Sequence, residues 1–208
     1  MKTRKRHISD FIHDFLCVYL PKHKCRSLQT INSYKVAINL LLDYFEEVHH
    51  LPYERLSFEA LNHNTITGFL DWLGDTRHCS VSTKNQRFAA IRSFLKFAAK
   101  EDITVMARYI DMDNVPKETP VETTAPHMSP AATAALLAQP DLSSTLGIRN
   151  LFFMILMYDS GARLQEILDL KVGDFTTSPP VITVTGKGRK QRRIPISTKT
   201  ANHFIQYA

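Results

Sequence analysis

The sequence predicts a mainly α-helical protein with a small β-sheet, divided between a helical N-terminal half and an α+β C-terminal half. Apolar residues of the first half recur at helical spacing, whereas two short β-branched runs flank a basic turn near the end. A proline-containing stretch separates the halves. We therefore expect a domain over residues 1–110, a linker over 111–127 and a second domain over 128–208.

Four amphipathic helices are predicted in the first domain, because four runs repeat apolar residues every three or four positions. The runs begin at Ile8, Ile31, Ile66 and Val81. Helix-breaking residues follow the first three runs, namely Pro21, Pro52 and Gly74. Thr83 and Gln86 offer a capping box to the fourth helix. Four such helices make a compact bundle.

The region after residue 110 first loses its apolar periodicity and then regains helical signals. Three prolines among Lys, Glu and Thr residues predict an extended linker over 111–127. Ser129 caps the next expected helix, with Pro130 at its first position. Residues 146–159 are apolar nearly all round and predict a buried helix that Gly161 closes.

The last part of the chain predicts another helix, a β-hairpin and a final helix. The helix runs from Arg163 to about Leu170. Residues 181–184 and 193–196 are the expected strands, and Pro195 places the second of them at a sheet edge or near its own end. Ser197 caps the final helix.

Composition favours a polyanionic partner. Lys and Arg outnumber Asp and Glu by 26 to 20, which gives a formal net charge of +6 and favours nucleic acid over a membrane. The three cysteines form no CxxC pair, so we expect reduced thiols and no metal site. The longest apolar run, 151–158, is far short of the about 20 residues that span a bilayer. A cytoplasmic protein that binds nucleic acid fits these features.

Arg163 and Glu166 form the first candidate site. A guanidinium at a helix-to-helix corner offers two parallel donors to one phosphate, which lysine cannot do. Glu166 lies one turn further on the same helix face, where its carboxylate can hold the guanidinium. The alternative is an ordinary surface ion pair, which is common and weak.

Lys187 forms the second candidate site, between Gly186 and Gly188 in a basic turn. Neighbouring cations lower the pKa of a lysine and make its ammonium a better proton donor. The alternative is a solvated basic hairpin that only touches the phosphate backbone. A nucleotide-binding P-loop is excluded, because the glycine spacing is wrong and no Ser or Thr follows the lysine.

These motifs resemble those of the tyrosine recombinases, the phage-integrase and Xer family. Residues 158–175 resemble the first arginine motif, and residues 186–195 its β-hairpin lysine motif. The first half is similar to the helical core-binding domain of that family, through Ser27, Thr30, Tyr34, Lys84, Asn85, Arg87, Arg92, Ser93, Phe94 and Phe97. The resemblance implies a four-helix SAM-like core-binding domain followed by part of the α+β catalytic domain.

The resemblance also implies roles. Arg163 would bind the scissile phosphate, Glu166 would orient Arg163, and Lys187 would protonate the departing 5′ oxygen. A tyrosine of the family attacks the phosphate to give a 3′-phosphotyrosine, which needs neither ATP, nor a metal, nor another cofactor.

Several family residues have no counterpart in the chain. Gln206 replaces the arginine of the family's His-x-x-Arg pair, and Tyr207 follows the hairpin too closely to be the nucleophile. We therefore expect a recombinase that stops midway through its catalytic domain and cannot cleave DNA alone. Surface left uncovered in such a domain would favour self-association. The alternatives are a non-catalytic DNA-binding or regulatory protein on the same scaffold, and a helical interaction protein that binds no DNA.

Further DNA contacts are expected from the fourth helix and the basic turn. Asn and Arg side chains are able to read base edges, and Lys more often holds phosphate. The candidates are Lys84, Asn85, Arg87, Arg92, Lys96, Arg189 and Arg192. A solvated polar face is the alternative for any one of them. A basic arm, which contains Lys2, Arg4, Lys5 and Arg6, is a further candidate for backbone contact.

Overall fold

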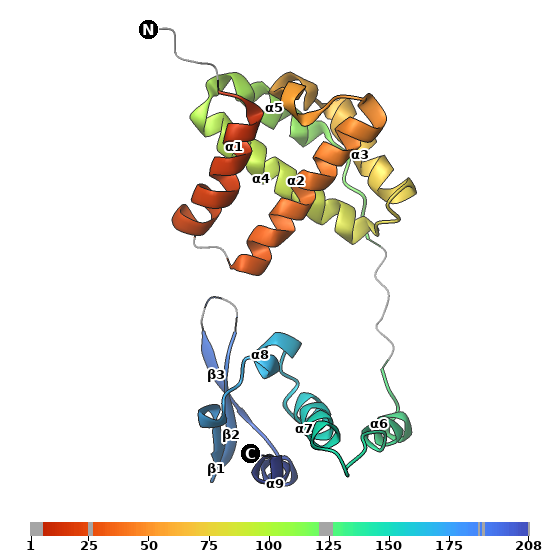
Figure 1. Cartoon of the computed structure of the whole chain (residues 1–208), viewed down its shortest axis with the longest axis vertical. Coiled ribbons are helices and arrows are strands. Elements are labelled where there is room, and N and C mark those ends of the chain that lie inside the picture. The colour runs from red at the N-terminus through yellow and green to blue at the C-terminus, as the bar shows by residue number, and fades with distance from the viewer. Residues whose placement is uncertain (1–5, 25–26, 121–126, 187, 189, 208) are drawn as a thin grey trace. The chain divides into compact units, whose positions relative to one another are not determined.

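The computed structural model describes residues 6–24, 27–120, 127–186, 188 and 190–207 (Figure 1). The chain forms two compact units, one up to residue 123 and one from residue 124. The described residues are mainly helical with one three-stranded sheet, which confirms the predicted fold class. Within these ranges no helix combines the length and apolar character that crossing a bilayer requires.

The first unit is entirely helical in its described part. Its α-helices are α1 (Ile8–Asp14), α2 (Leu28–His49), α3 (His63–Asp75), α4 (Val81–Glu101) and α5 (Met106–Asp111). A π-helical segment, η1 (Phe15–His23), continues α1, and the 3₁₀ turns are η2 (Tyr53–Arg55), η3 (Phe58–Ala60), η4 (Ile103–Val105) and η5 (Met112–Asn114). The four predicted helices therefore correspond to α1 with η1, α2, α3 and α4.

Two predicted helix boundaries in this unit are wrong. Pro21 does not end the first helix but lies inside η1, whose wider turn carries the bond from Lys24 N to Tyr19 O. A π turn is wider than an α turn, which leaves more room for a proline ring that would otherwise clash with the carbonyl group four residues before it. The capping box at Thr83 is also wrong, because Ser80 is the N-cap and its Oγ accepts from Thr83 N at 3.3 Å.

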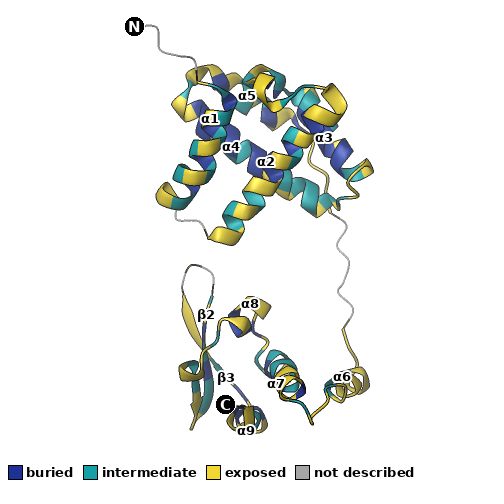
Figure 2. Ribbon diagram, viewed as in Figure 1, coloured by how far each residue is buried: buried dark blue, intermediate teal, exposed yellow. Residues whose placement is uncertain are grey.

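The core of the first unit is rich in aromatic rings. Phe15 is completely buried, and its ring centroid lies 5.5 Å from those of both Phe94 and Phe97 on α4. Buried residues line the inner faces of the helices, and exposed residues line their outer faces (Figure 2). Met112 and Val115 belong to this core, although both lie in the stretch predicted as linker. The predicted domain limits stay a prediction.

The second unit combines four helices with an antiparallel sheet. The helices are α6 (Pro130–Leu137), α7 (Thr145–Ser160), α8 (Leu164–Leu168) and α9 (Thr198–Tyr207), with a 3₁₀ turn η6 (Val172–Asp174). The strands are β1 (Phe175–Thr177), β2 (Pro180–Thr185) and β3 (Gln191–Pro195), in the order β1-β2-β3. The sequence predicted β2 and β3 but not the short β1. Pro195 ends an edge strand, as expected.

The core of this unit forms where the central strand meets the helices. Ile182 and Val184 of β2 are fully buried and share a cluster with Phe152 of α7 and Phe204 of α9. The prediction that the 146–159 helix is buried all round is wrong. The unit's described residues cover α7 only in part, and Tyr158 is 70% exposed.

Candidate functional site

Arg163 is presented at a sharp corner between α7 and α8. Gly161 ends α7 in the left-handed region with φ 58°, and its N–H donates to Met157 O at 3.1 Å. A residue without a Cβ adopts that conformation at no steric cost. Arg163 then adopts extended backbone as the N-cap of α8. Its side chain is 73% exposed, so the corner directs a guanidinium into solvent.

Glu166 is the centre of the site and is only 5% exposed. Its Oε2 accepts from Arg163 N at 2.9 Å, and its Oε1 accepts from Arg163 Nη1 at 2.9 Å. Arg192 of β3 donates its Nη1 to Oε1 at 2.8 Å and its Nη2 to Oε2 at 2.7 Å. The predicted contact between Arg163 and Glu166 is therefore present, but it belongs to a buried carboxylate that two arginines share.

The two arginines keep this carboxylate ionised. Hydrogen bonds from Arg192 and from the backbone of Arg163 lower the pKa of Glu166 to about 2, against the opposing effect of burial. Glu166 in turn raises the pKa of Arg192. Two guanidinium groups and one carboxylate leave a net charge of +1, carried mostly by the exposed Arg163. The cluster is therefore suited to attract an anion.

The turn between β2 and β3 begins beside the cluster. Gly186 N donates to Lys190 O at 2.8 Å and closes the turn. A Cβ at Gly186 would lie 3.0 Å from Glu166 Oε1, so this close approach favours glycine. Lys187 and Arg189 lie outside the described residues. The convergence of Lys187 on Arg163 therefore stays a prediction.

Three of the α4 residues predicted to bind DNA are held by the segment that follows α5. Lys84 forms an ion pair with Glu118, and Asn85 Nδ2 donates to the backbone oxygen of Glu118 at 2.8 Å. Arg92 forms an ion pair with Asp113. These acidic partners were not predicted. The sequence indicates Glu118 and Asp113 only weakly, as acidic residues in a stretch that also contains basic ones.

Lys96 and Arg87 differ from those three residues. Lys96 is exposed, and the described part of the chain offers it no hydrogen-bond or ion-pair partner. Arg87 lies between helices, where its Nη1 is 3.3 Å from both the backbone oxygen and Oγ of Ser33 on α2. Arg87 thus ties α4 to α2, an arrangement that its position in the sequence did not indicate.

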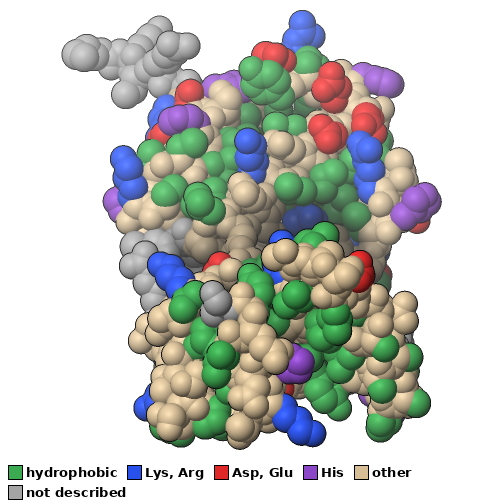
Figure 3. Space-filling model, turned by 60° about the horizontal axis from the view of Figure 1, so that its bottom comes forward, with side chains coloured by type: hydrophobic (Ala, Val, Ile, Leu, Met, Phe, Trp, Pro, Cys, Tyr) green, Lys and Arg blue, Asp and Glu red, His purple; other side chains and the backbone are tan. Residues whose placement is uncertain are grey.

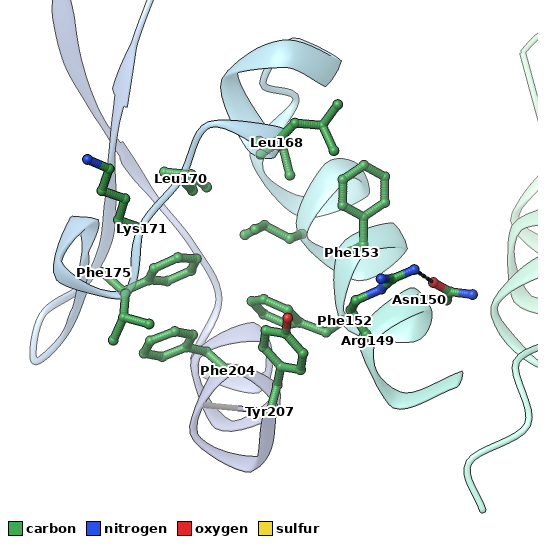
Figure 4. A pocket seen from close by; sticks show the side chains of 13 residues that line it. Arg149, Asn150, Phe152, Phe153, Leu168, Leu170, Lys171, Phe175, Phe204 and Tyr207 are labelled. Atoms are coloured by element: carbon green, nitrogen blue, oxygen red, sulfur yellow. Dashed lines mark hydrogen bonds between the residues drawn. The ribbon is translucent and has the colours of Figure 1, made fainter. Parts of the chain in front are cut away.

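The second unit also contains an apolar hollow of about 560 Å³. The rings of Phe152, Phe175, Phe204 and Tyr207 gather along it (Figure 4). The centroids of Tyr207 and Phe152 are 5.2 Å apart. Hydrophobic side chains are also exposed over the visible face of this unit (Figure 3).

Comparisons with known proteins agree with this fold. The model of the phage integrase N-terminal SAM-like domain matches residues 12–102, and that of the phage integrase family matches residues 127–207. The "Putative integrase/recombinase y4rC" of Sinorhizobium fredii is 32% identical over 199 residues, which cover 95% of this chain and 60% of that protein. Tyrosine recombinase XerC of Chlamydia trachomatis is 29% identical, over 90% of this chain and 62% of XerC.

Solved structures share the fold at lower identity. XerH site-specific recombinase in its post-cleavage complex with difH has a TM-score of 0.62 at 21% identity, over 86% of this chain and 52% of XerH. The Tn1549 transposon integrase in complex with transposon right-end DNA has a TM-score of 0.63 at 12% identity, over 94% of this chain and 64% of that one.

The chain spans about three fifths of the length of the curated relatives named above. Two models of the same family match its two units in the expected order, and the arginine corner and β-hairpin occupy the second of these matches. The chain belongs to the tyrosine recombinase family, also called the phage integrase family.

Proposed function

We propose that this chain is the DNA-binding part of a tyrosine site-specific recombinase or integrase. Its first unit acts as the core-binding domain, and its second unit forms the front of the catalytic domain. The intact parent cleaves and rejoins DNA strands through a 3′-phosphotyrosine, whose bond conserves the energy of the broken backbone. The chain alone holds the substrate but does not cleave it.

One observation carries this proposal. The carboxylate of the buried Glu166 accepts hydrogen bonds from the backbone N–H and from Nη1 of Arg163. The side chain of Arg163 is otherwise mostly exposed to solvent. That arrangement keeps the remaining donors of Arg163 open to a phosphate oxygen. Preorganised donors of this kind stabilise the charge that develops on the phosphate during strand cleavage. Glu166 orients the arginine, and Lys187 protonates the leaving 5′ oxygen.

The proposed DNA interface extends to α4 and the hairpin turn. Lys96 has no ion-pair partner among the described residues, whereas Lys84 and Arg92 first have to leave Glu118 and Asp113. Phosphate groups replace those carboxylates, because DNA offers many charges. Arg189 adds a further cation in the turn. The role of Arg87 is indirect, since it holds α4 on α2.

Binding of a fluorescein-labelled, random-sequence duplex tests the proposal. We expect affinity that falls linearly on a log–log plot against salt, and weaker binding after Arg163→Gln. A nicked suicide substrate should give no phosphotyrosyl adduct with this chain. An adduct would contradict the proposed incompetence, and binding that neither salt nor Arg163→Gln alters would contradict the proposed interface.

Self-association and a cytoplasmic location complete the proposal. The aromatic hollow and the exposed apolar residues of the second unit, such as Val172, support association between copies. Light scattering after gel filtration, with and without duplex DNA, measures the mass. A monomer under both conditions at micromolar concentration would remove self-association from the proposal. The cytoplasm is where bacterial or phage DNA is accessible to such a protein.

A further inference from the structure

We propose that Arg192 is a positioning residue, which acts through Glu166 on Arg163 and on Gly186 at the base of the hairpin turn, and is not itself a contact to DNA phosphate. This proposal deepens the proposed function and rests on it for the consequence in DNA binding. It also revises the expectation that Arg192 belongs to the DNA-binding surface.

The contacts of the two arginines differ in kind. Arg192 uses both terminal nitrogens on Glu166, at 2.8 and 2.7 Å, in a two-point fork. Arg163 uses a single terminal nitrogen at 2.9 Å. The side chain of Arg192 is 43% exposed against 73% for Arg163. Both terminal nitrogens of Arg192 are therefore bound to Glu166, whereas Arg163 keeps a terminal nitrogen that can bind a ligand.

The strand register explains how Arg192 reaches Glu166. Arg192 pairs with Val184 of β2, and paired residues of neighbouring strands point to the same face of a sheet. The side chain of Val184 is buried in the core cluster that also contains Ile167 of α8. Arg192 therefore projects toward the α8 side. The adjacent Arg193 pairs with Thr183 and belongs to the opposite face.

The same carboxylate meets the base of the turn. Gly186 approaches Glu166 Oε1 and Arg192 Nη1 so closely that a Cβ would lie 3.0 and 3.3 Å from them. Three elements thus converge on one carboxylate, namely the start of α8, the end of β2 and the β3 strand. Removal of Arg192 breaks the only described hydrogen bonds between β3 and Glu166, and so changes the surroundings of Gly186 and of Arg163.

Lysine cannot replace this fork, because one ammonium does not bind two carboxylate oxygens in a planar, parallel geometry. Arg192→Lys therefore keeps the charge but loses the clamp. Arg192→Gln loses both, and Arg193→Gln removes an equal charge from the other face of the same strand. These variants separate positioning from simple charge.

Nuclear magnetic resonance of the 208-residue chain tests the positioning directly. We expect Arg192→Lys and Arg192→Gln to shift the signals of Arg163 Nε and of the Gly186 amide. Both variants should also raise the pKa of Glu166, which is measured from the resonance of its carboxyl carbon. Arg193→Gln should leave these signals in place. Unchanged Arg163 and Gly186 signals in both Arg192 variants would overturn the proposal. Should Arg192→Gln fail to fold, Arg192→Lys carries the test.

Binding of the fluorescein-labelled random duplex provides the second arm. We expect Arg192→Lys and Arg163→Gln to weaken binding by similar factors, on the order of tenfold. The double variant should bind as Arg163→Gln does, because Arg192 acts through Arg163. Wild-type affinity in Arg192→Lys, or multiplied losses in the double variant, would contradict action through Arg163. Failure of the wild type to bind duplex would refute the proposed function, and the resonance arm would still decide the role of Arg192.

Discussion

Replacement of Lys96 by alanine should weaken DNA binding and flatten its dependence on salt. Lys96 is exposed on α4 and forms no ion pair with any described residue, so it breaks no described ion pair when it binds phosphate. Each phosphate contact contributes about 0.9 to the slope of log affinity against log salt. We therefore expect the slope to fall by about 0.9 in Lys96→Ala. A fourfold rise in salt concentration should then reduce the affinity of the variant about 3.5-fold less than that of the wild type.

Arg92→Ala should give a similar change of slope with a smaller loss of affinity. Arg92 has to leave Asp113 before it binds DNA, and an exposed ion pair of this kind is worth about 0.2–1 kcal/mol. In the wild type, the loss of this ion pair therefore offsets part of the binding free energy that the phosphate contact supplies. The double variant Arg92→Ala, Lys96→Ala should lose about 1.8 units of slope.

Fluorescence anisotropy with one labelled duplex over a series of salt concentrations measures both affinity and slope. Lys199→Ala is the matched control, since it removes an equal charge from an exposed position on α9 of the second unit. We expect the slope of this control to equal that of the wild type. If Lys96→Ala and Arg92→Ala kept the wild-type affinity and slope, α4 would not lie against DNA and the proposed interface would be wrong.

Three further outcomes are expected. Glu118→Gln should strengthen duplex binding up to about fivefold, because it frees Lys84 from its ion pair with the half-exposed Glu118. Anisotropy at low salt measures the change, and weaker binding would contradict competition between Glu118 and DNA for Lys84. The pKa of Glu166 is lowered from 4.5 to about 2, so its contribution to stability is present above about pH 4.5 and is lost as the pH falls toward 2. Over this range the melting temperature should fall further in the wild type than in Glu166→Gln, which keeps the losses from other carboxylates such as Asp159; equal falls in both proteins would contradict the lowered pKa. Gly161→Ala should lower the free energy of unfolding by about 1 kcal/mol. The cause is backbone strain at φ +58°, because nothing lies within 4 Å of the added Cβ. Denaturant titration measures the change, and an unchanged midpoint would refute the proposed backbone strain.

The local elements followed from the sequence because their signals lie within a turn or two of the chain. Ser129 with Pro130 begins α6, and Gly161 ends α7, as predicted. Such caps depend on hydrogen bonds between residues three or four positions apart. The Arg163–Glu166 contact has the same local character and was found for the same reason.

Other features depended on the packing of distant segments. The partial exposure of α7, and the place of Met112 and Val115 in the core of the first unit, reflect which faces meet neighbours. The sequence contained these residues but not the surfaces available to cover them. Local propensity is a weak signal wherever tertiary contacts decide the outcome.

The sequence by itself determined the mainly helical fold with its small sheet, the arginine corner and the basic hairpin, because periodicity, caps and turns act over short stretches of chain. Only the tertiary structure decided which cations face solvent. Arg192 meets Glu166 from 26 positions away, and Lys84 meets Glu118 from 34 positions away. Such pairings arise from strand register and from the path of the chain over α4, and no local pattern of residues specifies them.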